Sequence, residues 1–301
     1  SLALFLAVGI TGCSNTSGGG TGVANEDGLV VLNVASTGQP VSFDPADANL
    51  VVNEYTEYDC YDTLLDFNQD GTDVVPALAE SWEQVDDLTY TYKIREGVKF
   101  SDGSDLTMDD VLYSLNRVRE DAYGMSYLFE HVDSFEVDEK TRTLTVHLTQ
   151  PDSTWKYVPA TTPCQILKKS VVEAEGDAYG TNEGSVVGTG PYKFVSWAAD
   201  SQIVLEKNEY WWGGADNLAI DKINFYVMKD ASTIALAVKS GTIDFAPGIT
   251  NDVLPTYESL SNYNIIHDFE TSTVFVALNT QVAPFDDVNA RKALAYCIDS
   301  S

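Results

Sequence analysis

The sequence predicts a mixed α/β fold, and three patterns carry this prediction. Apolar side chains alternate with Thr and Lys over residues 89–94, and the same period of two returns over residues 143–148. Such alternation is typical of strands with one buried face. Between them, residues 107–118 repeat apolar side chains at helical spacing. Hydrophobic residues make up 44% of the 301 residues and charged residues 21%, which indicates a folded chain long enough for two domains.

The first elements expected along the chain are a buried strand over residues 29–35 and a helix over residues 54–65, with Asp44-Pro45 breaking the chain between them. Thr107 is a good N-cap for the next helix, and Asp110 three residues later completes an aspartate variant of the capping box. The apolar face of this helix is predicted to comprise Val111, Leu112, Leu115 and Val118.

A hairpin is expected where Phe135 and Val137 lead into the turn Asp138-Glu139-Lys140, because the second alternating segment follows that turn directly. Later segments predict strands over residues 202–206 and 222–227.

The C-terminal part predicts a helix over residues 231–238 that Gly241 stops, and a strand over residues 242–246. The run 273–278 is strongly β-prone. Asp286 or Asp287 is expected to cap a final helix that carries Ala293, Leu294, Cys297 and Ile298.

The N-terminal residues predict export and anchoring. The apolar run from Leu2 to Ile10 is too short to span a bilayer and resembles the core of a signal peptide. Ile10-Thr11-Gly12-Cys13 resembles a bacterial lipobox, so residues 1–12 are predicted to be part of a signal peptide and Cys13 to carry lipid. The Gly- and Ser-rich residues that follow, up to residue 28, are expected to form a flexible tether.

The remaining cysteines are Cys60, Cys164 and Cys297, and they form no CxxC pair and no zinc-ligand spacing. We expect buried thiols, because free cysteine behaves as a small hydrophobic residue. One disulfide with a third free thiol stays open as the alternative outside the cell. No metal site and no cofactor are predicted.

Charge excludes one class of partner. The chain has 46 Asp and Glu against 17 Lys and Arg, a net charge of −29. Such a surface repels the phosphates of nucleic acids. We interpret it as a solvated acidic coat that keeps a secreted protein soluble, with a cation site as the alternative.

The sequence contains no convincing catalytic set. His131, His147 and His267 lack an HExxH spacing, and neither a GxSxG motif nor a P-loop occurs in the 301 residues. This pattern favours binding over catalysis, with a secreted hydrolase as the alternative. Trp211-Trp212 is expected to be a packed aromatic corner before the turn Gly213-Gly214, and a sugar-stacking platform is the second interpretation.

Several short segments then occur in the order in which one family has them. They are Phe43-Asp44-Pro45, Tyr61-Asp62-Thr63-Leu64-Leu65, Val75-Pro76-Ala77-Leu78-Ala79-Glu80-Ser81-Trp82, Ile94-Arg95-Glu96-Gly97-Val98-Lys99-Phe100-Ser101-Asp102-Gly103, Thr107-Met108-Asp109-Asp110-Val111, Gly188-Thr189-Gly190-Pro191-Tyr192, Asn208-Glu209-Tyr210-Trp211, Gly241-Thr242-Ile243-Asp244, Ala283-Pro284-Phe285-Asp286-Asp287 and Arg291-Lys292-Ala293-Leu294. Residues 29–299 in this way resemble the extracellular solute-binding proteins of family 5, which include oligopeptide, dipeptide and nickel binders.

The resemblance implies a periplasmic-binding-protein-like clamp of two lobes (class II, cluster C type) with an inserted subdomain. Lobe I would combine residues 29–58 with 185–272, and residues 59–184 would form the insert. Lobe II would begin at residue 273, and residues 273–301 would supply only its start.

The resemblance also implies a function without covalent chemistry. The chain would be the substrate-binding lipoprotein of an ABC importer, a monomer that captures di- or oligopeptides outside the membrane and delivers them to the permease subunits. The same fold binding an oligosaccharide or another solute is the alternative. A nickel binder is not favoured, because the sequence has no histidine cluster. The residues that match ligand-lining positions, or lie near them, are Asn49, Leu50, Val51, Tyr127, Gly248, Thr273, Val274 and Phe275.

Overall fold

The computed structural model describes residues 28–46, 51–120, 125–267 and 275–298. The chain divides into two compact units, a larger one that ends at Ile266 and a smaller one that begins at His267. The predicted leader and nearly all of the predicted tether lie outside the described residues. No helix in the described ranges is long and apolar enough to cross a membrane.

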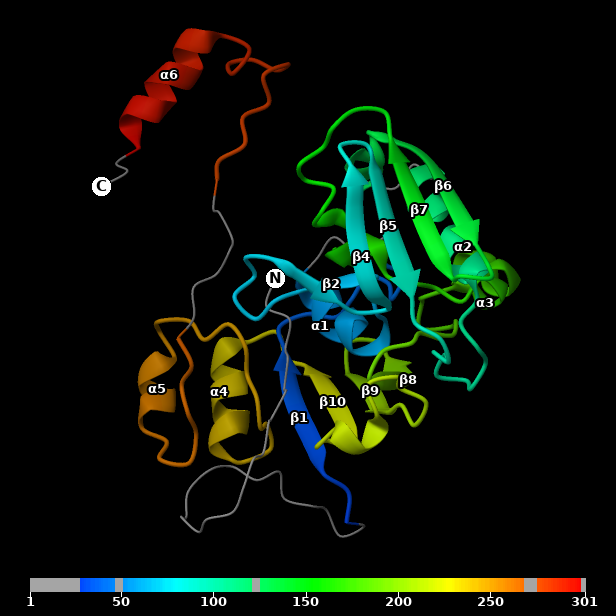
Figure 1. Cartoon of the computed structure of the whole chain (residues 1–301). Helices are drawn as coiled ribbons and strands as arrows, with labels where there is room; N and C mark the ends of the chain where they lie inside the picture. The colour runs from blue at the N-terminus through cyan, green and yellow to red at the C-terminus, as the bar shows by residue number, and fades with distance from the viewer. Residues whose placement is uncertain (1–27, 47–50, 121–124, 268–274, 299–301) are drawn as a thin grey trace. The chain divides into compact units, whose positions relative to one another are not determined.

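A four-stranded sheet in the larger unit pairs one strand from the beginning of the described chain with three strands from residues 192–227 (Figure 1). Its order is β1-β10-β9-β8, with β1 (Val31–Ser36) parallel to β10 (Lys222–Val227) and the other pairs antiparallel. The inner strand β9 (Gln202–Lys207) separates β10 from β8 (Tyr192–Ala198). The predicted strands at residues 29–35, 202–206 and 222–227 are thus confirmed within two residues.

A second four-stranded sheet is built from the middle of the chain, in the order β4-β5-β7-β6. Its strands β4 (Ala79–Asp86), β5 (Thr89–Ile94), β7 (Thr143–Leu148) and β6 (Val132–Asp138) are all antiparallel. The alternating apolar side chains of β5 and β7 all face the core and are buried. The predicted hairpin is therefore confirmed as β6 and β7.

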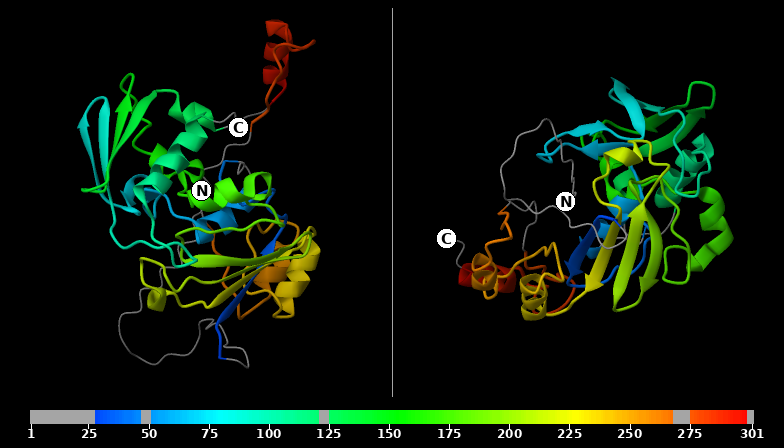
Figure 2. Two further views of the ribbon diagram at one scale, coloured as in Figure 1. Left: turned by 90° about the vertical axis from the view of Figure 1, so that its right-hand side faces the viewer. Right: turned by 90° about the horizontal axis from the view of Figure 1, so that it is seen from below.

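Helix α2 (Met108–Glu120) packs on the buried face of this second sheet, as Figure 2 shows. The expected capping box forms: Thr107 Oγ1 accepts from the N–H of Asp110 at 3.1 Å, and Asp110 Oδ2 accepts from the N–H of Thr107 at 3.0 Å. Val111, Leu115 and Val118 are buried, as predicted, and Leu112 is partly buried.

The remaining elements are short. They are α1 (Val51–Cys60), β2 (Leu65–Phe67), β3 (Val74–Pro76), η1 (Ser126–Phe129), η2 (Val158–Ala160), η3 (Thr162–Cys164), α3 (Lys169–Glu175), η4 (Gly176–Ala178), η5 (Ala215–Asn217), α4 (Ala231–Lys239), α5 (Leu254–Glu258) and α6 (Val288–Cys297). Strands β2 and β3 pair with each other as a two-stranded sheet, and α6 belongs to the smaller unit. Helices α4 and α5 pack beside β1, where Ala35 joins their apolar cluster.

Two predicted elements of the larger unit need correction. The helix expected to reach residue 65 ends at Cys60, because the next side chains serve different cores: Tyr61 packs with the first sheet, and Leu64 packs with the second. One continuous helical face cannot serve both. The strand expected over residues 242–246 is a single parallel bridge of Phe245 to Val34. There the Asp244 carboxylate accepts from the backbone N–H of Asn33 at 2.8 Å. The carboxylate thus replaces the backbone carbonyl that would accept this N–H in a regular β-ladder.

The described residues of the smaller unit form one helix, α6. Asp287, one of the two residues predicted to cap it, does so: its Oδ1 accepts from the N–H of Asn289 at 2.8 Å. No residue of α6 is buried. Of the β-prone run 273–278, Thr273 and Val274 lie outside the described residues, and residues 275–278 form no strand. They have no strand partner among the described residues, so β propensity alone does not order them.

Candidate functional site

The segment after β1 is anchored by a buried ion pair. Asp44 lies between β1 and α1, and Arg117 lies in the C-terminal half of α2. Arg117 Nη1 donates to Asp44 Oδ1 at 2.7 Å, and Nη2 donates to Oδ2 at 2.6 Å. The Asp44 side chain is only 7% exposed and the Arg117 side chain only 11%. Such a forked, buried pair fixes both partners in one orientation.

Arg117 belongs to a polar stripe on α2 that joins this helix to two distant segments, one at Asp44 and one at residues 167–169. Asp110 and Ser114 precede it at helical spacing, and both are buried. Asp110 Oδ1 accepts from the N–H of Lys169 at 3.0 Å, and Ser114 Oγ accepts from the N–H of Leu167 at 2.8 Å. The stripe therefore satisfies backbone and side-chain groups that would otherwise be buried without partners.

The segment at Cys60, where the chain leaves the first sheet for the second, lies beside residues 188–190, where the chain returns to the first sheet. Two glycines in the returning segment allow this crossing. The N–H of Gly190 donates to the carbonyl of Cys60 at 3.0 Å. A Cβ on Gly188 would lie 2.1 Å from that carbonyl oxygen, and a Cβ on Gly190 would lie 2.5 Å from the carbonyl carbon. Any side chain at either position would therefore push the two segments apart.

Two carboxylates flank the crossing. Burial raises the pKa of Asp59 to about 7, and its Oδ2 has no hydrogen-bond partner within the described ranges. Burial also raises the pKa of Asp62 to about 6, although the Trp212 indole N–H, 2.9 Å away, acts in the opposite direction. Desolvation dominates at both positions because the ionised form loses its hydration.

The predicted ligand-lining residues are described only in part. Asn49 and Leu50 lie outside the described residues, and Val51 is the first residue of α1. Thr273 and Val274 also lie outside the described residues, and Phe275, in the smaller unit, is 77% exposed.

The other two predicted residues lie on different elements of the larger unit. Tyr127 is in η1 and is 63% exposed. Gly248 follows α4 in a loop and has a φ of 68°, a conformation that favours glycine. No hydrogen bond joins Tyr127 to Gly248 in the described part of the chain, and the assignment of these residues to one ligand site stays a prediction.

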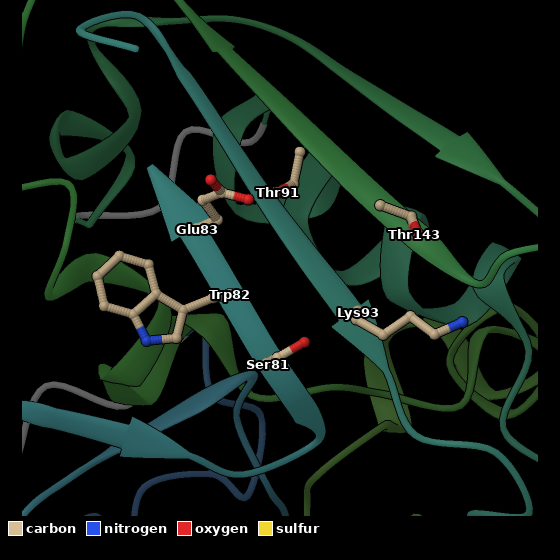
Figure 3. A pocket seen from close by; sticks show the side chains of 6 residues that line it. All are labelled: Ser81, Trp82, Glu83, Thr91, Lys93 and Thr143. Atoms are coloured by element: carbon tan, nitrogen blue, oxygen red, sulfur yellow. The ribbon is translucent and has the colours of Figure 1, made fainter. Parts of the chain in front are cut away.

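A shallow hollow of about 390 Å³ lies on the outer face of the second sheet (Figure 3). Figure 3 shows Glu83 and Thr91 on neighbouring strands, while the indole of Trp82 points away to the other side of β4. The Lys93 ammonium donates to the backbone carbonyl of Thr141. No predicted site residue lines the hollow. Its polar groups are three hydroxyls, the Lys93 amine and the Glu83 carboxylate. Among the described residues, none of these hydroxyls is hydrogen-bonded to that amine or carboxylate as a nucleophile would be to its base.

The aromatic corner is packed, as the first interpretation expected. Trp211 and Trp212 are each half-buried with ring centroids 6.0 Å apart, and Trp212 packs on the core of the second sheet. The Arg95 guanidinium lies 4.5 Å from the centre of the Trp212 ring. One face of this indole is thus occupied, which argues against a sugar-stacking platform.

Histidines and cysteines form no reactive cluster in the described part. His147 Nε2 lies 3.7 Å from Glu136 Oε2, and His131 lies beside Gln150. No group of three His, Cys, Asp or Glu side chains within the described ranges could hold a metal ion. Cys60 and Cys164 are buried free thiols, as predicted. The expectation of burial is wrong for Cys297, which is exposed on α6, because no residue of that helix is buried by the described residues of its unit.

Comparison with known proteins identifies the family. Residues 73–301 match the family model described as bacterial extracellular solute-binding proteins, family 5, middle part. The chain belongs to this family. Solute-binding proteins of family 5 act outside the cytoplasm, and the resemblance inferred from the ordered motifs is confirmed.

Relatives and solved structures agree with this assignment. Dipeptide-binding protein DppE of Bacillus subtilis is 28% identical over 99% of this chain and 58% of its own length. The structure of AppA from Bacillus subtilis, in complex with a nonapeptide, is 26% identical with a TM-score of 0.80 and covers 89% of this chain and 54% of that one. Haemophilus influenzae OppA in complex with RPPGFSPFR is 25% identical with a TM-score of 0.75, over 92% of this chain and 57% of that one.

The chain spans about half the length of the curated relatives that it matches. The family 5 fold is shown, and the mixed α/β fold class is confirmed. The boundaries predicted for lobe I, the insert and lobe II stay a prediction.

Sequence reasoning missed Arg117 and Asp59. A signal for Arg117 was present, because Asp110, Ser114 and Arg117 recur at helical spacing beside an apolar face. Nothing in the sequence pointed to Asp44 as the partner of Arg117, since 73 residues separate them. Asp59 gave no signal at all, because the desolvation of its carboxylate depends on the segments that the folded chain packs around it.

Proposed function

We propose that this chain is the ligand-binding part of the substrate-binding lipoprotein of an ABC importer and that the ligand is a di- or oligopeptide. The observation that carries the proposal is the likeness to AppA and OppA, both solved with a bound peptide, at TM-scores of 0.80 and 0.75. Peptide capture needs no covalent step.

The proposed mechanism is closure of two lobes on the ligand. Lobe I would comprise residues 29–58 and 185–272, residues 59–184 would form an insert on it, and lobe II would begin at residue 273. Hydrogen bonds to the peptide backbone would give affinity without selecting a sequence, and water would fill the space around the ligand side chains. The proposed ligand contacts are Asn49, Leu50, Val51, Tyr127, Gly248, Thr273, Val274 and Phe275.

Membrane attachment and partners complete the proposal. Cys13 would be lipidated at the outer face of the cytoplasmic membrane, and the monomeric binding protein would deliver its ligand to the permease subunits. Mass spectrometry of the membrane-bound protein tests the anchor. Cys13 is expected to be the first residue and to carry acyl chains, and an unmodified Cys13 inside a longer chain would contradict it.

Calorimetry of the protein produced from its full reading frame tests the ligand class. The probes are the nonapeptide RPPGFSPFR, a dialanine dipeptide and maltotriose. We expect one of the peptides to bind with a Kd of about 1 µM or tighter and the sugar not to bind. Binding of maltotriose alone would support the oligosaccharide alternative, and release of amino acids from the peptide would indicate a hydrolase.

A matched pair of variants tests one proposed contact. Tyr127→Ala removes an exposed ring that the proposal assigns to the ligand, and Tyr210→Ala removes an exposed ring that it does not. We expect Tyr127→Ala to weaken peptide binding about tenfold and Tyr210→Ala to leave it unchanged. Equal affinities for both variants would remove Tyr127 from the site.

A further inference from the structure

We propose that Asp70-Gly71, in the turn between β2 and β3, is a site of spontaneous covalent modification that converts Asp70 into isoaspartate. Aspartate followed by glycine is the dipeptide most open to this reaction, because glycine has no Cβ to obstruct attack by its own backbone nitrogen. The described ranges also contain Asp102-Gly103, which serves as an internal comparison. This inference does not rest on the proposed function.

The reaction is a dehydration followed by a hydrolysis. The backbone nitrogen of Gly71 attacks Cγ of the protonated Asp70 carboxyl, and an N–Cγ bond forms. The hydroxyl of the carboxyl leaves as water together with the proton of the nitrogen, and the product is a succinimide ring. Water then adds to Cγ, which restores aspartate, or to the main-chain carbonyl carbon of Asp70, which gives isoaspartate. The sum is an isomerisation, because the water released in the first step is taken up in the second.

Nothing in the described structure holds the Asp70 side chain away from this attack. Asp70 and Gly71 are both exposed. The Asp70 carboxylate makes no hydrogen bond or ion pair with another residue in the described part of the chain. A Cβ built on Gly71 would have no neighbouring atom within 4 Å. The carboxyl is therefore free to turn toward the Gly71 nitrogen.

The comparison site has the same dipeptide in a different environment. Asp102 Oδ1 accepts from the N–H of Ser104 at 3.0 Å and from Ser104 Oγ at 2.6 Å. Its Oδ2 accepts from the Lys168 ammonium. A Cβ built on Gly103 would lie 3.1 Å from the ring of Tyr210, so this ring covers the glycine. Both oxygens of Asp102 are thus occupied, and its surroundings are filled.

These contacts raise the barrier to attack at one site only. The N–H groups of Gly71 and Gly103 each donate at 2.9 Å to the carbonyl three residues earlier, so this bond slows both reactions alike. Asp102 must in addition give up its bond to the charged Lys168. The loss of one such bond is enough for about a tenfold difference in rate, or about 1.4 kcal/mol. In the folded chain Asp70 therefore reacts about tenfold faster than Asp102.

The modification alters the turn over residues 68–73. In isoaspartate the main chain runs through Cβ and Cγ and gains one carbon atom. The turn is closed by Asn68, whose N–H donates to the carbonyl of Asp73 at 2.8 Å. Asn68 Oδ1 also accepts from the N–H groups of Thr72 at 2.9 Å and Asp73 at 3.2 Å. A longer path after Asp70 displaces these two donors, so their amide hydrogen exchange should become faster.

Heavy-oxygen water tests the site in the 301-residue chain. The folded chain is kept for several weeks in a mildly acidic buffer made with this water, because each succinimide that opens takes up one heavy oxygen atom. Fragmentation mass spectrometry of proteolytic peptides then locates the label and distinguishes isoaspartate from aspartate. We expect label and isoaspartate at Asp70 and about tenfold less of both at Asp102. No label at Asp70, or equal label at both residues, would overturn the proposal.

Two controls separate the effect of the fold from that of the sequence. In urea, where the contacts of Asp102 are lost, both sites should be labelled at rates within about threefold of each other, since each glycine is followed by a hydroxyl residue. Asp70→Glu should abolish label at this position, because the longer side chain does not close a succinimide. A tenfold difference that persists in urea would contradict the role of the contacts and overturn the proposal.

A double variant tests the protection of Asp102 in the folded chain. Ser104→Ala with Lys168→Gln removes the Ser104 hydroxyl and the charged partner from the carboxylate. We expect label at Asp102 to rise to within about threefold of that at Asp70, with a parent-like urea midpoint as the sign that the variant is folded. Label at Asp102 that stays at the parent level in the folded variant would overturn the assignment of these contacts as the cause.

Discussion

Helices α2 and α6 both begin with a side-chain N-cap, and they differ in how far their residues are buried. The side chain of Thr107 caps α2 and that of Asp287 caps α6, each by accepting a backbone N–H of the first turn. In α2, Val111 and Leu115 are at most 1% exposed, whereas no residue of α6 is buried within its unit and Tyr296 is 90% exposed. The comparison teaches that a cap decides where a helix starts, and that burial depends on a partner surface.

The largest expected effect tests this contrast directly with the same substitution in both helices. Leu115→Ala should lower the free energy of unfolding by about 3 kcal/mol, because it leaves a cavity in the core of the second sheet. Leu294→Ala should change it by less than about 0.5 kcal/mol, because no core surrounds α6 in its unit. Urea unfolding of the 301-residue chain measures both. Equal losses would show that α6 packs as firmly as α2.

A smaller effect is expected from the charge that the larger unit buries. Burial raises the pKa of Asp59 to about 7, above the ordinary value of 3.8. The folded state therefore binds this proton more tightly than the unfolded state, and stability falls as pH rises from about 4 to about 7. This rise in pKa corresponds to about 4 kcal/mol near pH 8. Because Asp59 stays partly exposed to water, we expect about half of this value. Asp59→Asn should therefore stabilise the chain by about 2 kcal/mol near pH 8 and have almost no effect near pH 4, by urea unfolding at each pH.

Asp138 in the β6–β7 turn is the matched control for the sign. Hydrogen bonds from the backbone N–H groups of Thr141 and Lys140 lower the pKa of this exposed carboxyl. Its contribution is present at neutral pH and is lost as pH falls through the folded pKa. Asp138→Asn should accordingly destabilise the chain near neutral pH and not in acid. The same pH dependence for both variants would contradict the assignment of Asp59 as a desolvated carboxylate.

The smallest effect compares two helix caps. Asp230 caps α4, whose Ile234 and Val238 are buried, and its Oδ1 accepts from the N–H of Thr233 at 2.7 Å. Asp230→Ala should lower the free energy of unfolding by about 1 kcal/mol. Asp287→Ala should leave that value unchanged and reduce only the helical circular dichroism signal, because the folding of α6 is not coupled to a core in its unit. A loss of stability with Asp287→Ala would show that coupling exists.

Local sequence signals predicted most of the secondary structure and the family. The strands β5, β7, β9 and β10 and the caps of α2 and α6 lie at or within a residue of their predicted places. Each of these signals involves residues within a few positions of one another, where alternation, helical spacing and capping act. The order of short motifs predicted the family for the same reason, since each motif is a short run of neighbouring residues and several are turns or caps.

Tertiary structure alone decided the contacts between distant segments. It ended α1 at Cys60 because Tyr61 and Leu64 enter different cores, and it reduced the strand at residues 242–246 to one bridge. Of the candidate site, the sequence indicated Asp44 as part of a motif, and only the fold revealed that Arg117, 73 residues away, binds it. The physical reason is range: local propensity extends over about one helical turn, whereas burial and ion pairing depend on whichever segment the folded chain brings alongside.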